Sequence, residues 1–364
     1  MTCNFGEVGY WRDWLAHNSY DSYWNPMTYL EDLESLEIPV LIQSGWFDGG
    51  TKGTQMAYER LQEGGNRNVR MIIGPWTHSD RGGRYLEGQD MGEEADIDLF
   101  DLYGKWFDYW LKDIDNNILD IPPVQTYLMN SNDWLTDTQY PLSTTLFTPF
   151  FLGSSKSTIS SNTQGTLTTE FPISSAEYDS YSYNPAYPTP SFYAFLKRNA
   201  LEEYMRVVDH REDLISYETN PLNESIDIAG PLVLVLYASS SAIDTDWFAT
   251  LYGIDQLGQP YPLGVTFGML RARYRDSYTS PDFLVPEEVY PYTIELAHTA
   301  ITIPAGHRLR LDLSSASFPE YSRNLNTGGH NEMDEQLQVA SQKIFHTEEF
   351  PSHLLLPIMK SDSR

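Results

Sequence analysis

The chain has 364 residues, more than a single hydrophobic core usually organises, so two domains are expected. Its formal net charge of −28 (23 basic against 51 acidic residues) disfavours nucleic acid and anionic membranes as partners. No run of 18 apolar residues is present that could span a bilayer. Cys3 is the only cysteine, which excludes an internal disulfide and favours a reducing compartment such as the cytoplasm, while a secreted parent stays open.

A strand, a helix and a second strand are predicted early in the chain, after short helical pieces and loops over residues 11–35. Residues 38–44 (IPVLIQS) and 68–74 (NVRMIIG) are nearly continuous apolar runs, typical of strands buried on both faces. Residues 52–63 between them have helical spacing and end at the pair Gly64-Gly65. This order predicts a βαβ unit, hence parallel strands joined by a right-handed crossover.

An amphipathic helix is predicted over residues 96–113, with apolar side chains three and four residues apart. Turn residues at 115–117 (DNN) and Pro122-Pro123 then interrupt the pattern. We therefore place a domain boundary there, with an α/β domain over residues 1–122 and a second domain over residues 123–364.

The second domain is predicted to consist mainly of strands. Short alternating or apolar runs recur between turn residues, with one weak helical pattern near residues 192–206 and a Ser/Thr-rich stretch at 154–169 that is typical of an exposed loop. Many short strands separated by Gly, Pro, Asn and Asp indicate a β-sandwich or jelly roll. The expected fold class is thus α/β followed by all-β.

Asp48 and His78 are the candidate catalytic residues. Each comes just after one of the two predicted parallel strands, Asp48 within GWFDGG and His78 within GPWTHS. The carboxyl ends of parallel strands meet at one edge of a sheet, where ligand sites of open α/β sheets lie. A carboxylate that orients an imidazole is the acid–base pair of a serine hydrolase, and in α/β-hydrolases these residues follow the serine in the chain.

Two plainer interpretations stay open from spacing alone. A histidine after a strand is often a surface residue, and an aspartate before a helix is often its N-cap. Trp46 and Trp76 flank the two loops and could either line a substrate pocket or pack against the edge of the sheet.

The strings IPVLIQSGWFDGG and VRMIIGPWTHS resemble the signature of the cocaine esterase / X-Pro dipeptidyl-peptidase (CocE/NonD) family of α/β-hydrolases. Further stretches resemble the family's linker helix and C-terminal jelly roll, among them WFDYWLKDIDNNILDIPPV, GMLRARYR, IPAGHRLRLDLSSASFP and RNLNTGG. The resemblance implies a partial hydrolase domain, beginning with the end of a cap region at residues 1–35, followed by a jelly roll. It also implies that Asp48 and His78 are two members of the catalytic triad.

The serine that the resemblance requires has no counterpart in the sequence. The family carries its nucleophile on a G-x-S-x-G-type turn early in the hydrolase domain, and no such motif occurs here. Ser154 and Ser155 follow a glycine but fall in the Ser/Thr-rich loop. The expectation is therefore a C-terminal portion of a longer hydrolase, inactive alone, whose upstream segment supplies the serine and the oxyanion-hole tyrosine.

The expected substrate is a small ester, amide or peptide, with no cofactor and no metal. Family members that act on α-amino-acid esters carry carboxylates just past the catalytic aspartate, whereas this chain has Gly50 and Thr51 there. The acidic stretch GHNEMDE (residues 329–335) matches no zinc or calcium spacing and is typical of a solvated loop. A homodimer stays open, and the rival hypothesis is a jelly roll that binds a carbohydrate or a protein beside an inert α/β remnant.

Overall fold

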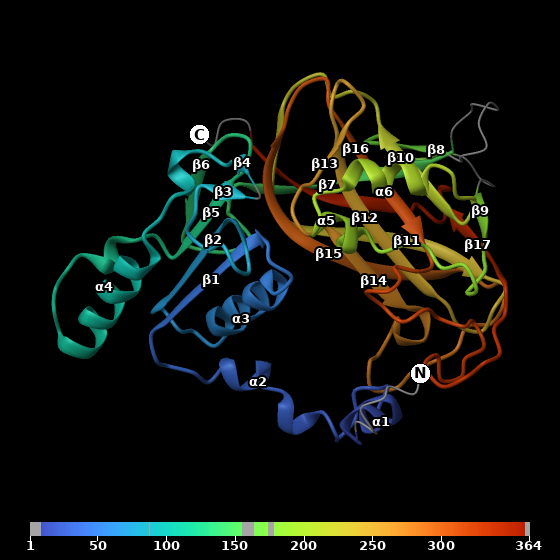
Figure 1. The fold of residues 1–364 in the computed structure, drawn as a ribbon, viewed down its shortest axis with the longest axis horizontal. Coiled ribbons are helices and arrows are strands. Elements are labelled where there is room, and N and C mark those ends of the chain that lie inside the picture. Colours follow the sequence, from blue (N-terminus) through green and yellow to red (C-terminus); the bar gives the residue numbers. More distant parts are fainter. Residues whose placement is uncertain (1–8, 87, 155–163, 174–177, 361–364) are drawn as a thin grey trace.

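The computed structural model describes residues 9–86, 88–154, 164–173 and 178–360. An α/β unit and a large β-sandwich follow one another along the chain, as Figure 1 shows. The N-terminal segment, drawn in blue, runs past both parts and carries α1 (Gly9–Ala16) and α2 (Leu30–Leu33). The predicted fold class, α/β followed by all-β, is confirmed.

The first sheet has the strand order β1-β2-β5-β6. Its elements are β1 (Val40–Phe47), α3 (Thr51–Glu63), β2 (Val69–Thr77), β5 (Val124–Leu128) and β6 (Asp133–Asp137). β1 and β2 are parallel, with Val40 opposite Val69 and Phe47 opposite Thr77. The predicted βαβ unit is therefore present, and each strand runs three residues further than its apolar run indicated.

β5 and β6 belong to this first sheet. β5 begins just past the boundary placed at residue 122; it pairs in parallel with β2, and β6 pairs antiparallel with β5. β2 would otherwise be an edge strand, and it is buried along almost its whole length, so it needs a neighbour on each side. The first sheet thus extends past the Pro-rich linker to residue 137.

Helices cover the two faces of this sheet. α4 (Leu99–Lys112) is the predicted amphipathic helix, and Asp98 caps it by accepting hydrogen bonds from the backbone amides of Phe100 and Asp101. Its apolar side packs with Ile72 and Trp76 of β2. α3 packs against the opposite face. No helix in the described ranges is long and apolar enough to cross a membrane.

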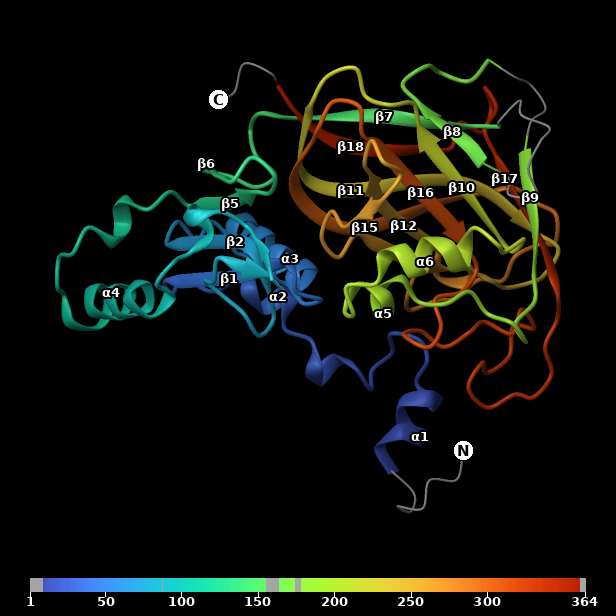
Figure 2. The same ribbon diagram turned by 45° about the horizontal axis from the view of Figure 1, so that its top comes forward.

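The second part is a sandwich whose strands are joined by hydrogen bonds into one 12-stranded sheet. Its strands are β7 (Thr145–Gly153), β8 (Gln164–Thr168), β9 (Tyr178–Tyr183), β10 (Leu214–Thr219), β11 (Ile226–Ser240), β12 (Asp246–Ile254), β13 (Pro260–Tyr261), β14 (Phe267–Arg271), β15 (Tyr290–Ile303), β16 (Arg308–Ser314), β17 (Ala340–Phe345) and β18 (His353–Met359). Two short helices, α5 (Phe192–Leu196) and α6 (Leu201–Val208), account for the weak helical pattern near 192–206 and lie against the sandwich in Figure 2.

One hydrophobic core runs through both parts. Trp46 and Tyr58 of the α/β unit belong to the same cluster of buried residues as Leu234 and Ile294 of the sandwich. Backbone hydrogen bonds also cross the junction, from the amide of Val265 to the carbonyl of Trp46 (2.9 Å) and from that of Met129 to Ala300 (3.0 Å). The sandwich therefore covers the face of the small parallel sheet that carries α3.

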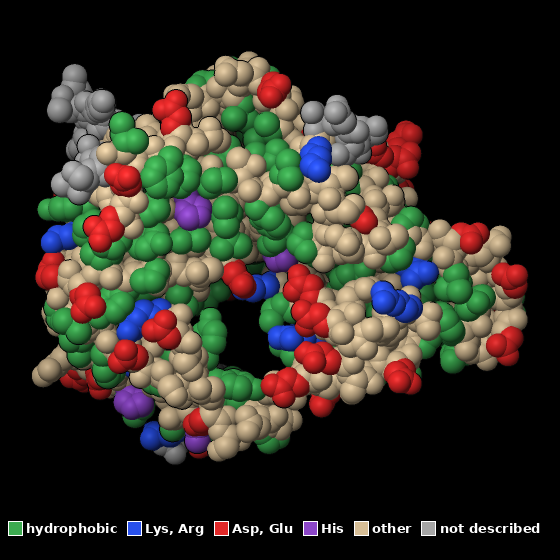
Figure 3. Space-filling model, turned by 180° about the vertical axis from the view of Figure 1, so that it is seen from behind, with side chains coloured by type: hydrophobic (Ala, Val, Ile, Leu, Met, Phe, Trp, Pro, Cys, Tyr) green, Lys and Arg blue, Asp and Glu red, His purple; other side chains and the backbone are tan. Residues whose placement is uncertain are grey.

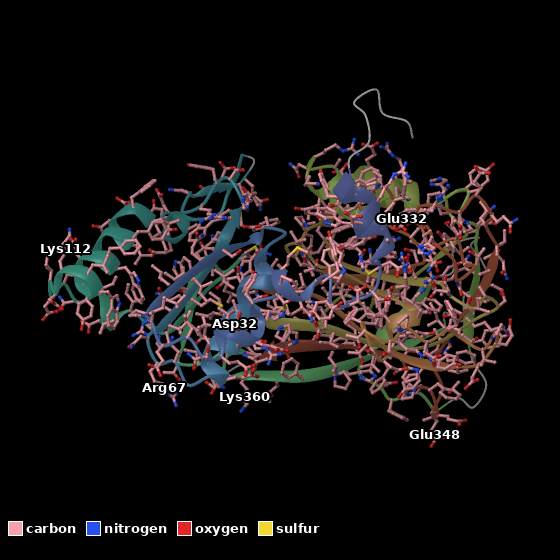
Figure 4. The ribbon with its side chains drawn as sticks, turned by 90° about the horizontal axis from the view of Figure 1, so that it is seen from below. Asp32, Arg67, Lys112, Glu332, Glu348 and Lys360 are labelled. Atoms are coloured by element: carbon pink, nitrogen blue, oxygen red, sulfur yellow. The ribbon has the colours of Figure 1, made fainter. Side chains whose placement is uncertain are left out.

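The surface has an opening beside the N-terminal segment. Seen from behind in Figure 3, the molecule is hollowed between the α/β unit, the sandwich and this segment, and acidic and basic side chains gather at the rim of the opening. Figure 4 shows Lys112 at the outer end of α4 and Glu332 on the sandwich side of the molecule.

Candidate active site

Asp48 and His78 lie side by side at the carboxyl edge of the first sheet. β1 ends at Phe47 and β2 at Thr77, and these two residues are paired across the parallel strands. The residues that follow them, Asp48 and His78, therefore lie next to each other. The Oδ2 atom of Asp48 lies 3.2 Å from Nδ1 of His78, which is the contact that the βαβ interpretation requires.

The carboxylate of Asp48 is buried, and a backbone hydrogen bond fixes one of its two oxygens. Its side chain is 6% exposed, and its Oδ1 atom accepts a hydrogen bond of 2.8 Å from the backbone amide of Gly50. The backbone carbonyl of Asp48 accepts from the amide and the hydroxyl of Thr51, so the turn into α3 is fixed. The N-cap residue of α3 is Gly50 and no side chain caps the helix, so Asp48 is not the N-cap; its side chain fixes the turn before α3 and directs Oδ2 at the imidazole.

The His78 ring is open to solvent, with 78% of its side chain exposed. Among the described residues its ring contacts Asp48 and Arg81, whose Nη2 atom lies 3.2 Å from Nδ1, and no hydrogen bond joins it to a serine. An imidazole oriented through Nδ1 by a carboxylate can use Nε2 as a general base. The pair is therefore built for proton transfer to or from a group that approaches from the exposed side.

A cleft of about 360 Å³ opens in front of His78. One wall comes from the sheet edge (Phe47, Thr77, His78), and the other comes from α5 of the sandwich (Tyr193, Leu196, Lys197). The ammonium group of Lys197 lies 4.3 Å from the ring centre of Tyr193 and 3.4 Å from a carboxylate oxygen of Glu320. The cleft thus combines aromatic, aliphatic and cationic surface beside the acid–base pair.

Gly49 allows the two walls to approach each other. A Cβ atom at this position would lie 3.1 Å from the hydroxyl of Tyr193, which is tighter than an ordinary contact. Reasoning from the sequence did not find the wall from α5, because α5 is 144 residues further along the chain (192 − 48) and has only a weak helical pattern. The glycine pair after Asp48 was the one local sign of a close approach.

Trp46 and Trp76 are packed in the core and are absent from the cleft wall. Each is 1% exposed, and their indole N–H groups donate to the carbonyls of Tyr127 (2.8 Å) and Ala95 (3.1 Å). Each tryptophan lies within its strand, two residues before Asp48 or His78. Side chains of a strand point alternately to the two faces of the sheet, and both faces of this sheet are covered. This placement corresponds to the packing alternative for both tryptophans.

A serine, a histidine and an aspartate also meet inside the sandwich. The hydroxyl of Ser154 lies 2.8 Å from Oδ1 of Asp179 and 3.1 Å from Nε2 of His346, while the same Nε2 lies 3.2 Å from Oδ2 of Asp179. A triad needs the two ring nitrogens to face different partners, and here one nitrogen faces both. Burial by itself raises the pKa of Asp179, but hydrogen bonds from His346 and Ser154 outweigh it and lower the pKa. Ser155 lies outside the described residues.

The other conspicuous polar residues have structural partners. Asp244 and Asp246 are fully buried and form ion pairs with Arg273 (2.7 Å) and Arg271 (2.8 Å). In the acidic stretch 329–335, Asp334 accepts from the backbone amide of His330 and Glu332 from the hydroxyl of Ser322. Within the part of the chain that the structure describes, no three His, Cys, Asp or Glu side chains are placed to hold a metal ion together.

Two protein families match successive parts of this chain. Residues 116–355 match a family described as the X-Pro dipeptidyl-peptidase C-terminal non-catalytic domain, and residues 6–80 match the X-Pro dipeptidyl-peptidase (S15) family. Cocaine esterase from Rhodococcus sp. is 32% identical over 355 residues, covering 95% of this chain and 61% of the esterase.

Two solved structures have the same fold over nearly the whole chain. An aminopeptidase from a marine sediment Thaumarchaeota archaeon superimposes with a TM-score of 0.84 at 27% identity, covering 97% of this chain and 60% of its own. An α-amino acid ester hydrolase has a TM-score of 0.82 at 25% identity, with 96% and 61% covered. The chain thus spans about three fifths of the length of these relatives.

Proposed function

The chain belongs to the cocaine esterase / X-Pro dipeptidyl-peptidase family of hydrolases, and from this premise we propose that it supplies the acid–base half of a serine hydrolase. His78 acts as the general base that takes the proton of a serine hydroxyl and returns it to the leaving group. Asp48 orients the ring through Nδ1 and stabilises the imidazolium. The single observation that carries the proposal is the 3.2 Å contact between these residues at the mouth of a cleft.

The proposed nucleophile is a serine that lies outside these 364 residues. No G-x-S-x-G turn occurs in the sequence, and no described serine hydroxyl is hydrogen-bonded to the ring of His78. The proposed substrates are small esters, amides or peptides, because the relatives are named as an esterase, an aminopeptidase and an amino acid ester hydrolase. Gly50 and Thr51 provide no carboxylate for a substrate ammonium group, which favours neutral acyl groups.

The location of the serine is tested with a fluorophosphonate probe, which labels activated serines covalently. We expect no labelling of the chain alone, and labelling when it is expressed together with the reading frame directly upstream. Labelling of a serine within residues 1–364 that disappears in His78→Ala would place the nucleophile in this chain and overturn this part of the proposal.

The acid–base assignment is tested by hydrolysis of a p-nitrophenyl ester, with an unlabelled sample of the form that reacts with the probe. We expect His78→Ala to lower kcat/KM by at least about a thousandfold and Asp48→Asn by a similar factor, because the base and its tautomer are lost. His210→Ala is the control, since His210 is exposed on the sandwich. Near-normal turnover in His78→Ala would refute the assignment.

A binding function of the sandwich is the second candidate. An open groove is lined by Ser180, Ser182, Asn184, Tyr187 and Arg211, and Tyr187 is 73% exposed. An exposed tyrosine beside hydroxyl and guanidinium groups suits a carbohydrate. A glycan array probed with the whole chain tests it: binding that is lost in Tyr187→Ala and kept in Tyr85→Ala would favour this function, and no binding would exclude the glycans on the array.

A further inference from the structure

Arg81 contacts both members of the acid–base pair. Its Nη2 atom lies 3.2 Å from Nδ1 of His78 and 3.5 Å from Oδ2 of Asp48. These are the same nitrogen and the same oxygen that face each other at 3.2 Å. Arg81 follows His78 by three residues, so the turn that ends β2 delivers the imidazole and the guanidinium to one spot. Three groups therefore share a single hydrogen-bonding position.

The two contacts of Nδ1 cannot be made by the same form of the neutral ring. A guanidinium has only N–H donors, so towards Arg81 the Nδ1 atom must accept and the ring proton must be on Nε2. An ionised carboxylate only accepts, so towards Asp48 the Nδ1 atom must carry the proton. The second form alone leaves Nε2 free to take a proton, as a general base must.

We propose that Arg81 is a positioning residue that holds His78 in a resting tautomer, with the proton on Nε2, until its guanidinium is withdrawn. This inference rests on the proposed function of the pair. Arg81 also places a positive charge 3.2 Å from the ring nitrogen that faces Asp48. Withdrawal of Arg81 lets Nδ1 donate to Asp48 and removes that charge.

The surroundings of Arg81 leave it room to move. Its side chain is 37% exposed, and Asp48 is its ion-pair partner among the described residues. The same side chain lines a second groove, along β1, with Val40, Leu41 and Tyr103. Two glycines, Gly82 and Gly83, follow it, and Gly82 has a φ of +79°. The guanidinium can therefore turn into the groove while Asp48 stays fixed by Gly50.

A purely structural role makes a different prediction. If Arg81 only neutralises the buried carboxylate, removing it changes stability and leaves the tautomer of His78 unchanged. The tautomer is therefore the discriminating readout, and it can be measured in the chain as it exists, without the serine.

The experiment is long-range ¹H–¹⁵N correlation spectroscopy of the whole chain, labelled with ¹⁵N-histidine, at about pH 8. His78→Gln assigns the signals. We expect mainly the Nε2–H form in the unchanged chain and a shift of at least about tenfold towards the Nδ1–H form in Arg81→Leu, since the competing donor is lost. Arg81→Lys keeps a donor and a charge and should remain close to the original ratio.

Arg84→Leu is the matched control, because Arg84 forms its ion pair with Asp90 (2.7 Å) away from the pair. An equal tautomer ratio in the unchanged chain and Arg81→Leu, or a dominant Nδ1–H form in both, would overturn the inference. If Arg81→Leu does not fold, Arg81→Met provides the same comparison, because it also has no N–H donor. Failure of the proposed function is seen separately, as retained esterase activity in His78→Ala, so the two outcomes are distinguishable.

Discussion

The hydroxyl of Tyr140 lies 2.7 Å from Nδ1 of His298, and the two rings stack with their centres 5.6 Å apart. Tyr140 follows the last strand of the α/β unit, and His298 lies in β15 of the sandwich, so this hydrogen bond and ring contact connect the two parts. Burial, together with the charge of Lys52, lowers the pKa of His298 to about 4. The neutral ring accepts the proton of the tyrosine hydroxyl.

This pair makes stability dependent on pH. Above pH 6.5 His298 is neutral in both states and contributes no dependence, whereas below it the unfolded chain takes up a proton that the folded chain refuses down to about pH 4. We expect the free energy of unfolding to fall by about 1–2 kcal/mol from pH 7 to pH 5 through this group. In urea titrations, the unfolding free energy of His298→Phe should fall less from pH 7 to pH 5 than that of the unchanged protein. That of His210→Gln should fall by the full amount. Equal pH dependence in all three proteins would contradict the prediction.

Trp46 should matter for stability rather than for substrate binding. Trp46→Phe removes buried volume and leaves the carbonyl of Tyr127 without its donor, so we expect a loss of about 1–3 kcal/mol in unfolding free energy. Trp11→Phe, on the exposed α1, should change it by less than about 0.5 kcal/mol. A change in KM of the active form without a loss of stability would instead support a pocket role for Trp46.

Gly49 in the turn before α3 and Gly53 within α3 should respond differently to substitution by alanine. Gly49→Ala forces the hydroxyl of Tyr193 back by a few tenths of an ångström and shifts this wall of the cleft away from the sheet edge, so we expect KM to rise by about 3- to 10-fold. Gly53, inside α3, has open space around a new Cβ atom, and Gly53→Ala should raise the unfolding free energy by about 0.5–1 kcal/mol with KM unchanged. An unchanged KM in Gly49→Ala would show that the walls are not in functional contact.

Asp244 should be essential to the sandwich. Its carboxylate accepts from Arg273 (2.8 Å) and Asn324 (2.8 Å), and removing it leaves a buried guanidinium unpaired. We expect Asp244→Ala to lower the unfolding free energy by about 3–5 kcal/mol. Asp108→Ala breaks an exposed ion pair with Lys112 on α4 and should cost about 0.5 kcal/mol or less. Similar losses in both variants, measured by urea unfolding, would argue against the buried network.

Much of this protein follows from local patterns in its sequence. Two apolar runs with a helix between them predict parallel strands, and parallel strands place the residues after them at one edge, so Asp48 and His78 could be paired from the sequence. The resemblance of the surrounding motifs to one hydrolase family gave the chemistry. These features succeed because they depend on contacts between neighbouring segments of the chain.

Only the tertiary structure decided which strands and walls surround that pair. β5 has the same kind of strand pattern as those of the sandwich, and its place beside β2 depends on the burial of both edges of β2. The approach of α5 to His78 depends on how the two parts pack, and the contact of Arg81 with Asp48 depends on the course of a turn. Side-chain periodicity records which residues are buried, but it does not record which surface buries them.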